Sequence, residues 1–386
     1  MAAQPQSEPS VSELQEAQDR LRIVLDSSRD FLKRGWSVKG FRDIIESETG
    51  YSAQLWQEVC RLGWPGTMLA EQYGGTDGNF LEVAGLMEAC GAAIAPLPLA
   101  GNVVAAALVA GCGNDGAKQR LLPGAASGEG PLALALLEAG LSADRTNVKL
   151  AARAEGGGFT LEGSKLFVPY ANAAREFIVA ARLDGQLALF AVPAAAAGVQ
   201  LVKLNPLDWS ALFEVKFGAV KVGPQALLAR GDEAAKLLGE ALLQGDTLIA
   251  CEVAGVCQTA LDLAAAYAND RIAFGRPIGQ FQGVKHRLVN LRADIEVARS
   301  LIRTATQDIA LADPKRRVSA AHVAFWCIDK LKKVPEGCLQ VFGGIGFTWE
   351  HDIHLYLRRA ATLSSLLGEQ SEYREIVANH LDSGAL

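Results

Sequence analysis

The chain has 386 residues, of which 50% are hydrophobic and 21% charged, and its formal net charge is −6. This length allows two or three domains, and the acidic balance argues against nucleic acid as a partner. The seven cysteines are scattered without a C-x-x-C pair, and the five histidines lie near no further ligand, so no metal is expected. We expect a cytoplasmic globular protein with reduced thiols.

The first part of the chain predicts helices. Residues 1–10 are polar and lack the apolar core of a signal peptide, so they are expected to be a disordered lead-in. Residues 11–130 show apolar side chains at helical spacing, interrupted by a break at Pro65-Gly66 and a short turn over residues 70–75. This pattern predicts an N-terminal α-helical domain.

The pattern changes near Pro131. Short runs of alternating apolar residues, separated by Gly-Gly-Gly and Asp-Gly, predict strands and hairpins in a β domain over residues 131–228. From residue 229 to 386 the helical pattern returns. The fold class predicted is therefore α+β, with a helical domain, a middle β domain and a C-terminal helical domain.

A long apolar helix begins near Asp246, and Glu252 and Asp262 within it argue against a membrane span. Gly275 and Pro277 predict a sharp turn, after which a second helix continues to about residue 311. Arg271 and Arg276 place positive charge at this turn, which suits a phosphate group. An ordinary helical hairpin with solvated arginines explains the same residues.

A second motif, Q-V-F-G-G-I-G-F, spans residues 340–347, and its glycines would let backbone N–H groups approach a ligand. Together with R-I-A-F-G-R-P-I-G-Q-F-Q at residues 271–282, it resembles the acyl-CoA dehydrogenase family of flavoenzymes over almost the whole chain. The resemblance implies an N-terminal α domain, a middle β domain and a C-terminal four-helix bundle that forms dimers or tetramers.

The resemblance also implies FAD as the cofactor. Arg271, Phe274 and Gln282 would hold FAD bound to the neighbouring subunit. Gln340, Gly343 and Gly344 would contact its adenosine and pyrophosphate end. By the same resemblance the substrate is an acyl-CoA thioester, in fatty acid β-oxidation or related lipid metabolism, and the acceptor of electrons is an electron-transfer flavoprotein.

The carboxylate that would remove the α proton is missing from its usual place. Alignment with the family puts Leu367 at the position of the usual glutamate, and a leucine accepts no proton. Glu369 is two residues away and would need a shifted loop.

A minority of the family places this base on the long helix, at the position of Gly245. The neighbouring Asp246 points about 100° away along a helix, so it serves only if the helix is rotated. Its alternative role is a helix N-cap, because aspartate accepts hydrogen bonds from free backbone N–H groups.

The residues expected to contact the flavin ring are also changed. Leu137 stands in place of a hydroxyl residue, Ala143 in place of a serine, and Pro169 in place of a threonine. Phe167 replaces a tryptophan and still offers an aromatic face.

Three functions remain open. The first is an FAD-dependent acyl-CoA dehydrogenase that acts as a homo-oligomer with Asp246 or Glu369 as an unusual base. The second is a catalytically silent subunit of a heteromeric dehydrogenase, similar to heterotetrameric members that act on sterol-derived thioesters, which completes the FAD site of its partner. The third is an oxidase related to acyl-CoA oxidases.

Overall fold

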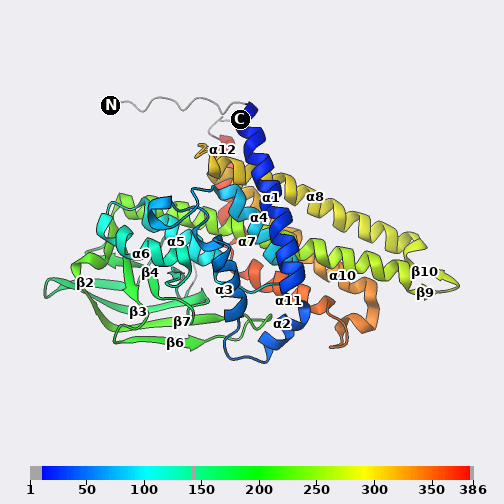
Figure 1. Ribbon diagram of the computed structural model, residues 1–386, viewed down its shortest axis with the longest axis horizontal. Coiled ribbons are helices and arrows are strands. Elements are labelled where there is room, and N and C mark those ends of the chain that lie inside the picture. Colours follow the sequence, from blue (N-terminus) through cyan, green and yellow to red (C-terminus); the bar gives the residue numbers. More distant parts are fainter. Residues whose placement is uncertain (1–10, 141–144, 383–386) are drawn as a thin grey trace.

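The computed structural model describes residues 11–140 and 145–382. The predicted lead-in over residues 1–10 and the altered position Ala143 lie outside the described residues. Helices come first in the chain, a sheet follows, and helices return, so the α+β prediction is confirmed (Figure 1). The domain boundaries at 130 and 228 stay a prediction.

The N-terminal part consists of helices that are started by polar caps. The side chains of Ser37, Ser52, Asn79 and Asn114 accept hydrogen bonds from the first turns of α2, α3, α4 and α6. The helices are α1 (Val11–Gly35), α2 (Val38–Ile45), α3 (Ala53–Arg61), α4 (Phe80–Ala92), α5 (Leu99–Gly111) and α6 (Asp115–Ser127). Short 3-10 turns lie at η1 (Trp64–Gly66) and η2 (Glu71–Tyr73).

The middle part is a mostly antiparallel sheet in the order β6-β7-β3-β2-β4-β5-β8, with β1 parallel to β4. Its strands are β1 (Leu132–Ala135), β2 (Ala151–Glu155), β3 (Gly158–Pro169), β4 (Glu176–Leu183), β5 (Gln186–Pro193), β6 (Val199–Lys203), β7 (Leu212–Val222) and β8 (Leu227–Arg230), with η3 (Pro224–Ala226) before the last. A shift of register between Lys165 and Val168 interrupts the pairing of β3 with β7. At this bulge Phe167 takes a φ of 53°.

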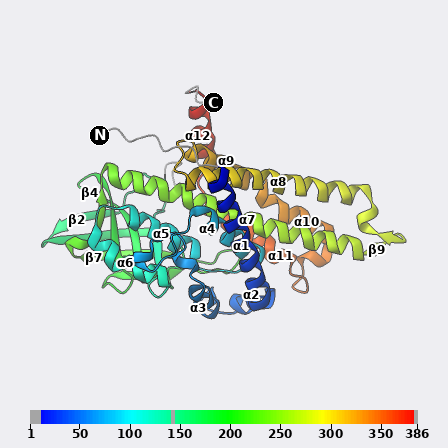
Figure 2. The same ribbon diagram turned by 45° about the horizontal axis from the view of Figure 1, so that its top comes forward.

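The C-terminal part is the predicted bundle, in which α7 packs against α8, α9, α10 and α11. Its elements are α7 (Asp232–Asp270), β9 (Ile272–Ala273), β10 (Arg276–Pro277), η4 (Ile278–Gln280), α8 (Gln282–Ala310), α9 (Arg316–Asp329), η5 (Leu331–Lys333), α10 (Val334–Phe342), η6 (Gly343–Phe347), α11 (Ile353–Ser365) and α12 (Gln370–Asp382). The ends of α7 and α8 project from the body and are joined by β9 and β10 (Figures 1 and 2).

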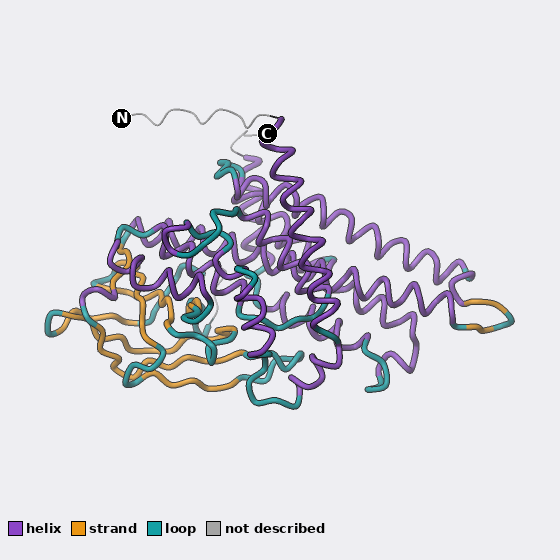
Figure 3. The backbone as a smooth tube through the Cα atoms, viewed as in Figure 1, coloured by secondary structure: helices purple, strands orange, loops and turns teal. Residues whose placement is uncertain are grey.

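Helix α7 lies at the centre of the molecule and packs against elements of all three parts. It contacts the N-terminal helices, the sheet and the C-terminal helices, and it runs from the strand-rich side of the molecule through the helical side to the projecting hairpin (Figures 1 and 3). A Cβ atom on Gly91 would lie 1.9 Å from the carbonyl oxygen of Glu252, so α4 and α7 approach each other through glycine. Helix α7 is long and apolar enough to span a membrane. However, 67% of its most apolar 18-residue stretch is buried inside the molecule, as in a core helix.

Candidate active site

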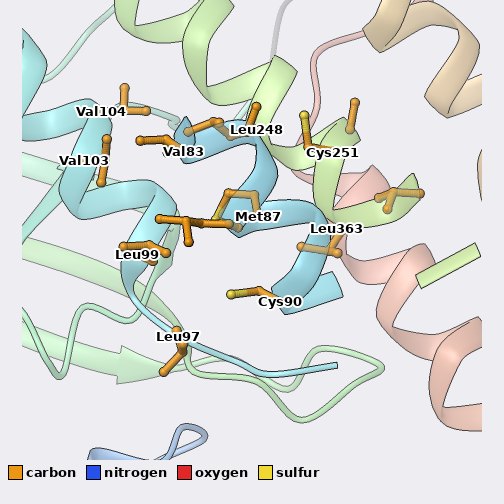
Figure 4. Packing of buried hydrophobic residues seen from close by; sticks show 14 of the residues in the cluster. Val83, Met87, Cys90, Leu97, Leu99, Val103, Val104, Leu248, Cys251 and Leu363 are labelled. Atoms are coloured by element: carbon orange, nitrogen blue, oxygen red, sulfur yellow. The ribbon is translucent and has the colours of Figure 1, made fainter. Parts of the chain in front are cut away.

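An apolar cavity of about 160 Å³ lies where the sheet meets α5, α7 and α11. Leu97, Val104 and Leu363 line it, and these same side chains belong to the core that α4, α5, α7 and α11 share (Figure 4). Because its walls continue the hydrophobic core, the cavity suits an apolar ligand or ring.

Strand β3 brings two of the altered flavin-contact positions to this cavity. Phe167, which is 37% exposed, and Pro169 both line it, and Leu137 lines it from the segment after β1. The bulge in β3 turns Phe167 out of the strand's regular alternation. The structure therefore places Phe167 in the cavity, while its contact with flavin stays a prediction.

Asp246 also lines the cavity, but the N-cap interpretation of this residue is wrong, because α7 begins at Asp232. Its carboxylate accepts hydrogen bonds from Nη1 and Nη2 of Arg145 at 2.8 and 2.6 Å. The hydroxyl of Tyr373 donates a third, at 2.7 Å. Both side chains of the ion pair are only 7% exposed. Burial alone would lower the pKa of Arg145, but Asp246 raises it above its ordinary value, so the guanidinium stays charged.

The Arg145–Asp246 pair separates the apolar cavity from a second, polar cleft of about 640 Å³. The cleft lies among the first half of α7, the start of α9 and α12, and both cavities are lined by Arg145, Asp246 and Leu242. On the cleft side Arg145 also pairs with Glu372, with Nε 3.2 Å from Oε2. The ion pair is therefore a wall between the two spaces.

Gly368 packs closely behind this wall. Its N–H donates a hydrogen bond to the hydroxyl of Tyr373 at 2.7 Å. A Cβ atom at Gly368 would lie 2.9 Å from Nε of Arg145, so a larger residue would push the guanidinium away from its position. Burial and the neighbouring Asp246 raise the pKa of Tyr373, which keeps its hydroxyl protonated as a donor.

At the other positions considered for the catalytic base, no carboxylate reaches the cavity. Glu369 is exposed just before α12 and does not line the cavity. Leu367 is buried, and Gly245 lines the cavity without a side chain. Of the two predicted carboxylates, only Asp246 is brought to the cavity.

A carboxylate that the sequence analysis did not single out also lines the cavity. Glu252 on α7 accepts hydrogen bonds from Nε and Nη2 of Arg359 at 3.0 and 2.5 Å. Nη1 of Arg359 donates to Asp208 at 2.8 Å, and Nη2 lies 3.3 Å from the hydroxyl of Tyr170. Burial raises the pKa of Glu252, and the pairing with Arg359 opposes this shift.

One signal was available for Glu252. It follows Gly245 by two helical turns, which places both on the same face of α7. Nothing local in the sequence pointed to Arg359 or Arg145, because their partners are distant in the chain. Thr362 was also missed, and it matters because its buried hydroxyl lines the cavity without a hydrogen-bond partner within the described ranges 11–140 and 145–382.

The predicted FAD-binding residues of the first motif lie at the other end of α7. Phe274 is 96% exposed at the tip of the projecting hairpin, and Arg271 and Gln282 beside it are also exposed. None of the three lines the apolar cavity of its own chain. Gln340, Gly343 and Gly344 are exposed at the end of α10 and in η6. Their contact with FAD stays a prediction.

The comparisons with known proteins all match this chain to one family. Residues 18–129 match the family model for the N-terminal domain of acyl-CoA dehydrogenases, and residues 235–381 match the model for the C-terminal domain. The chain is 30% identical over 339 residues to the acyl-CoA dehydrogenase IpdE2 of Mycolicibacterium smegmatis, across 87% of this chain and 90% of that relative.

Solved structures agree in fold. A variant of the Tcur3481-Tcur3483 steroid ACAD superposes with a TM-score of 0.87 at 27% identity, covering 96% of this chain and 99% of that chain. The ChsE4-ChsE5 complex of Mycobacterium tuberculosis superposes with a TM-score of 0.85 at 25% identity, covering 97% and 98%.

Proposed function

Because the chain belongs to the acyl-CoA dehydrogenase family, we propose that it is a subunit of an FAD-dependent acyl-CoA dehydrogenase which completes the FAD site of a partner chain and does not itself remove the substrate proton. The complex would desaturate an acyl-CoA thioester between Cα and Cβ. An electron-transfer flavoprotein would take the electrons, in the cytoplasm.

The observation that carries this proposal is the pairing of both cavity carboxylates with buried arginines. A general base must accept a proton, and protonating Asp246 or Glu252 would leave Arg145 or Arg359 without its main counter-charge. The wall formed by Arg145 also separates the cavity from the polar cleft.

FAD, when bound, supplies the acceptor for the hydride that leaves Cβ. The polar edge of its flavin ring requires several hydrogen bonds, whereas Leu137 and Pro169, which stand at two of the positions expected to contact the ring, line this cavity without a side-chain hydrogen-bond donor. In contrast, the side chains of Arg271, Gln282 and Gln340 have no hydrogen-bond or ion-pair partner within the described part of the chain. These exposed groups fit FAD held largely by another chain, with Phe274, Gly343 and Gly344 beside it.

Two of the similar structures combine two differently named proteins: Tcur3481-Tcur3483 and the ChsE4-ChsE5 complex. By analogy, we favour a heterotetramer over a homotetramer for this chain. The partner would be a family member that carries a carboxylate where this chain has Leu367.

The test is the ratio of FAD to protein, measured by absorbance. The chain purified alone should retain little FAD, and co-expression with such a partner should give a yellow complex that straight-chain or steroid-derived acyl-CoA thioesters bleach. A ratio near one per chain for the isolated protein, with bleaching by a thioester, would contradict the proposal. Rapid oxygen consumption by the complex would instead indicate an oxidase.

A second function is supported by one observation. Glu252 lines the cavity, and burial raises the pKa of its carboxyl above the ordinary value although Arg359 opposes the shift; a raised pKa is the direction that a general base requires. If the chain is a homo-oligomeric dehydrogenase with this base, Glu252→Gln should abolish flavin bleaching while FAD stays bound. In the heteromeric complex the same change should leave bleaching intact.

A further inference from the structure

One corner of the apolar cavity is polar. It is formed where the segment after β3, the loop before β7, α7 and α11 meet. We call it the polar corner, and its residues are Tyr170, Ser210, Glu252 and Arg359. Apart from Arg145, Asp246 and Thr362, the rest of the described lining is apolar. A few polar groups in an apolar cavity are the usual means of selecting and orienting a ligand.

The polar corner holds more negative than positive charge. The guanidinium of Arg359 is shared by Glu252 and Asp208, and no second cation pairs with either carboxylate within the described ranges 11–140 and 145–382. Asp208 also accepts hydrogen bonds from the backbone N–H and the hydroxyl of Ser210, at 3.2 and 2.8 Å. Glu252 has no such additional donor in the described part of the chain. A further hydrogen-bond donor would therefore stabilise Glu252.

One oxygen of Glu252 is available to supply this acceptor. Both hydrogen bonds from Arg359 go to Oε1, and Oε2 accepts none from the residues that the structure describes. The described unpaired side-chain atoms that are fully enclosed belong to Glu176, His354 and Thr362, so Oε2 of Glu252 retains accessible surface. Because Glu252 lines the apolar cavity, this surface faces the cavity.

Tyr170 offers a donor beside this acceptor. Its hydroxyl oxygen accepts a hydrogen bond from Nη2 of Arg359 at 3.3 Å, and its own proton has no acceptor among the described residues. Burial raises the pKa of Tyr170, which keeps this proton in place at neutral pH. The backbone of Tyr170 has a φ of 53°, which is uncommon for a large side chain and costs free energy. The surrounding contacts therefore hold this hydroxyl in a fixed position.

Two glycines leave room for a ligand. Gly101 on α5 and Gly245 on α7 both line the cavity, and a Cβ atom at either position would meet no atom within 4 Å. Neither glycine has a positive φ, so the backbone does not require glycine there. The cavity volume of about 160 Å³ is similar to that of apolar cavities of roughly 150 Å³ that hold a benzene molecule. A six-membered ring therefore fits.

We propose that the apolar cavity binds an uncharged apolar ring that carries a hydroxyl group. The hydroxyl donates to Oε2 of Glu252 and accepts from the hydroxyl of Tyr170, so one group satisfies both. A carbonyl or an ether offers Glu252 no proton, and a plain hydrocarbon satisfies neither residue. The ring lies between Gly101 and Gly245. Such a ligand is neither FAD nor a thioester, and its binding does not require a partner subunit.

The experiment uses the full chain purified alone, with para-fluorophenol, fluorobenzene and para-fluoroanisole as probes followed by fluorine NMR. The phenol should bind saturably and about tenfold more tightly than fluorobenzene, because only the phenol contacts Glu252 and Tyr170. The anisole should bind no better than fluorobenzene, because its oxygen has no proton to donate. Equal binding of all three, or no saturable binding of the phenol at millimolar concentration, would overturn the assignment.

Two variants test the site, and a third is the control. Gly101→Leu fills the cavity and should abolish binding of both the phenol and fluorobenzene. Tyr170→Phe should weaken the phenol about tenfold and leave fluorobenzene unchanged, a selectivity that a general loss of structure would not produce. Tyr356→Phe should bind all probes like the wild type, because Tyr356 is buried but does not line the cavity.

Either of two results would contradict the proposed ligand: undiminished binding by Gly101→Leu, or an unchanged preference for the phenol in Tyr170→Phe. If Tyr170→Phe does not fold, Gly101→Leu and the comparison of the three probes decide. The FAD-to-protein ratio is measured in the same sample. That ratio tests the proposed function, and the titrations test the hydroxyl site, so either can fail alone.

Discussion

The two ends of α7 use polar side chains in opposite ways. In its buried half, Asp246 and Glu252 are each held by an arginine from a distant segment. At its projecting end, the side chains of Arg271 and Phe274 are exposed and have no polar or ionic partner in the described part of the chain. The interior charges are therefore satisfied within the chain, and the exposed groups remain available to another molecule.

This difference separates groups that stabilise the chain from groups that are proposed to act on a partner. A buried ion pair is costly to break, because the remaining charge stays out of water. An exposed side chain without contacts contributes little to folding and is free to contribute to binding. Substitutions at the two ends of α7 should therefore have different consequences.

The largest effect is expected from breaking the deepest ion pairs. Arg359→Met leaves Glu252 and Asp208 without their shared cation and should lower the free energy of unfolding by about 3–5 kcal/mol, measured by urea denaturation. The control is Arg292→Met, whose exposed pair with Glu296 is worth less than about 1 kcal/mol. Equal losses in the two variants would mean that burial does not distinguish these pairs.

The effects on stability of replacing Arg145 and Asp246, which form the wall beside the apolar cavity, should be coupled. Arg145→Met and Asp246→Asn should each destabilise the chain, and the double variant should be more stable than the sum predicts by about 1–3 kcal/mol. A double-mutant cycle in urea measures this. Additive losses would show that the two side chains do not depend on each other.

Asp246→Asn also tests catalysis. In the complex with a partner, turnover should change by less than about threefold, whereas loss of a general base costs about 10²–10⁴-fold. A loss of that size with FAD still bound would identify Asp246 as the base.

A smaller effect is expected at the hairpin. Phe274→Ala should leave the stability of the isolated chain within about 0.5 kcal/mol of the wild type, because the ring is exposed. In the complex it should weaken FAD retention by about tenfold, as expected for loss of an aromatic contact worth up to ~1.5 kcal/mol. FAD retention equal to the wild type would remove this residue from the cofactor site. Exposed Val289→Ala on α8 is the matched control.

The smallest effect concerns pH. The pKa of His354 is lowered in the folded chain, mainly by burial, from an ordinary value of 6.5. Below pH 6.5 the unfolded chain therefore binds a proton that the folded chain does not, and stability should fall as the pH falls. His354→Gln should reduce this slope in urea denaturation. A slope should remain, because burial lowers the pKa of His322 as well. An unchanged slope would show that His354 does not contribute.

The fold was predictable because its signals are local. The helical periodicity, the alternating strands and the turn at Gly275 and Pro277 all predicted elements that the structure contains. The chemistry of the cavity was less accessible. Asp246 was singled out, but its partners Arg145 and Tyr373 lie 101 and 127 residues away in the chain. Ion pairs across such distances leave no periodic signal. The N-cap interpretation was wrong for another reason, because α7 begins at Asp232, and Glu252 was passed over although it lies on the same face of the helix as Gly245.

In the proposed complex, the length of α7 would link folding to assembly. Its 39 residues form one uninterrupted helix of about 58 Å, fixed in the core by its buried half and free at the hairpin. The helix would therefore present its tip to a partner only when the core around Asp246 and Glu252 has formed. A chain with an incomplete core would lack a rigidly held hairpin for binding a partner. Only correctly folded chains would then enter the complex with a partner.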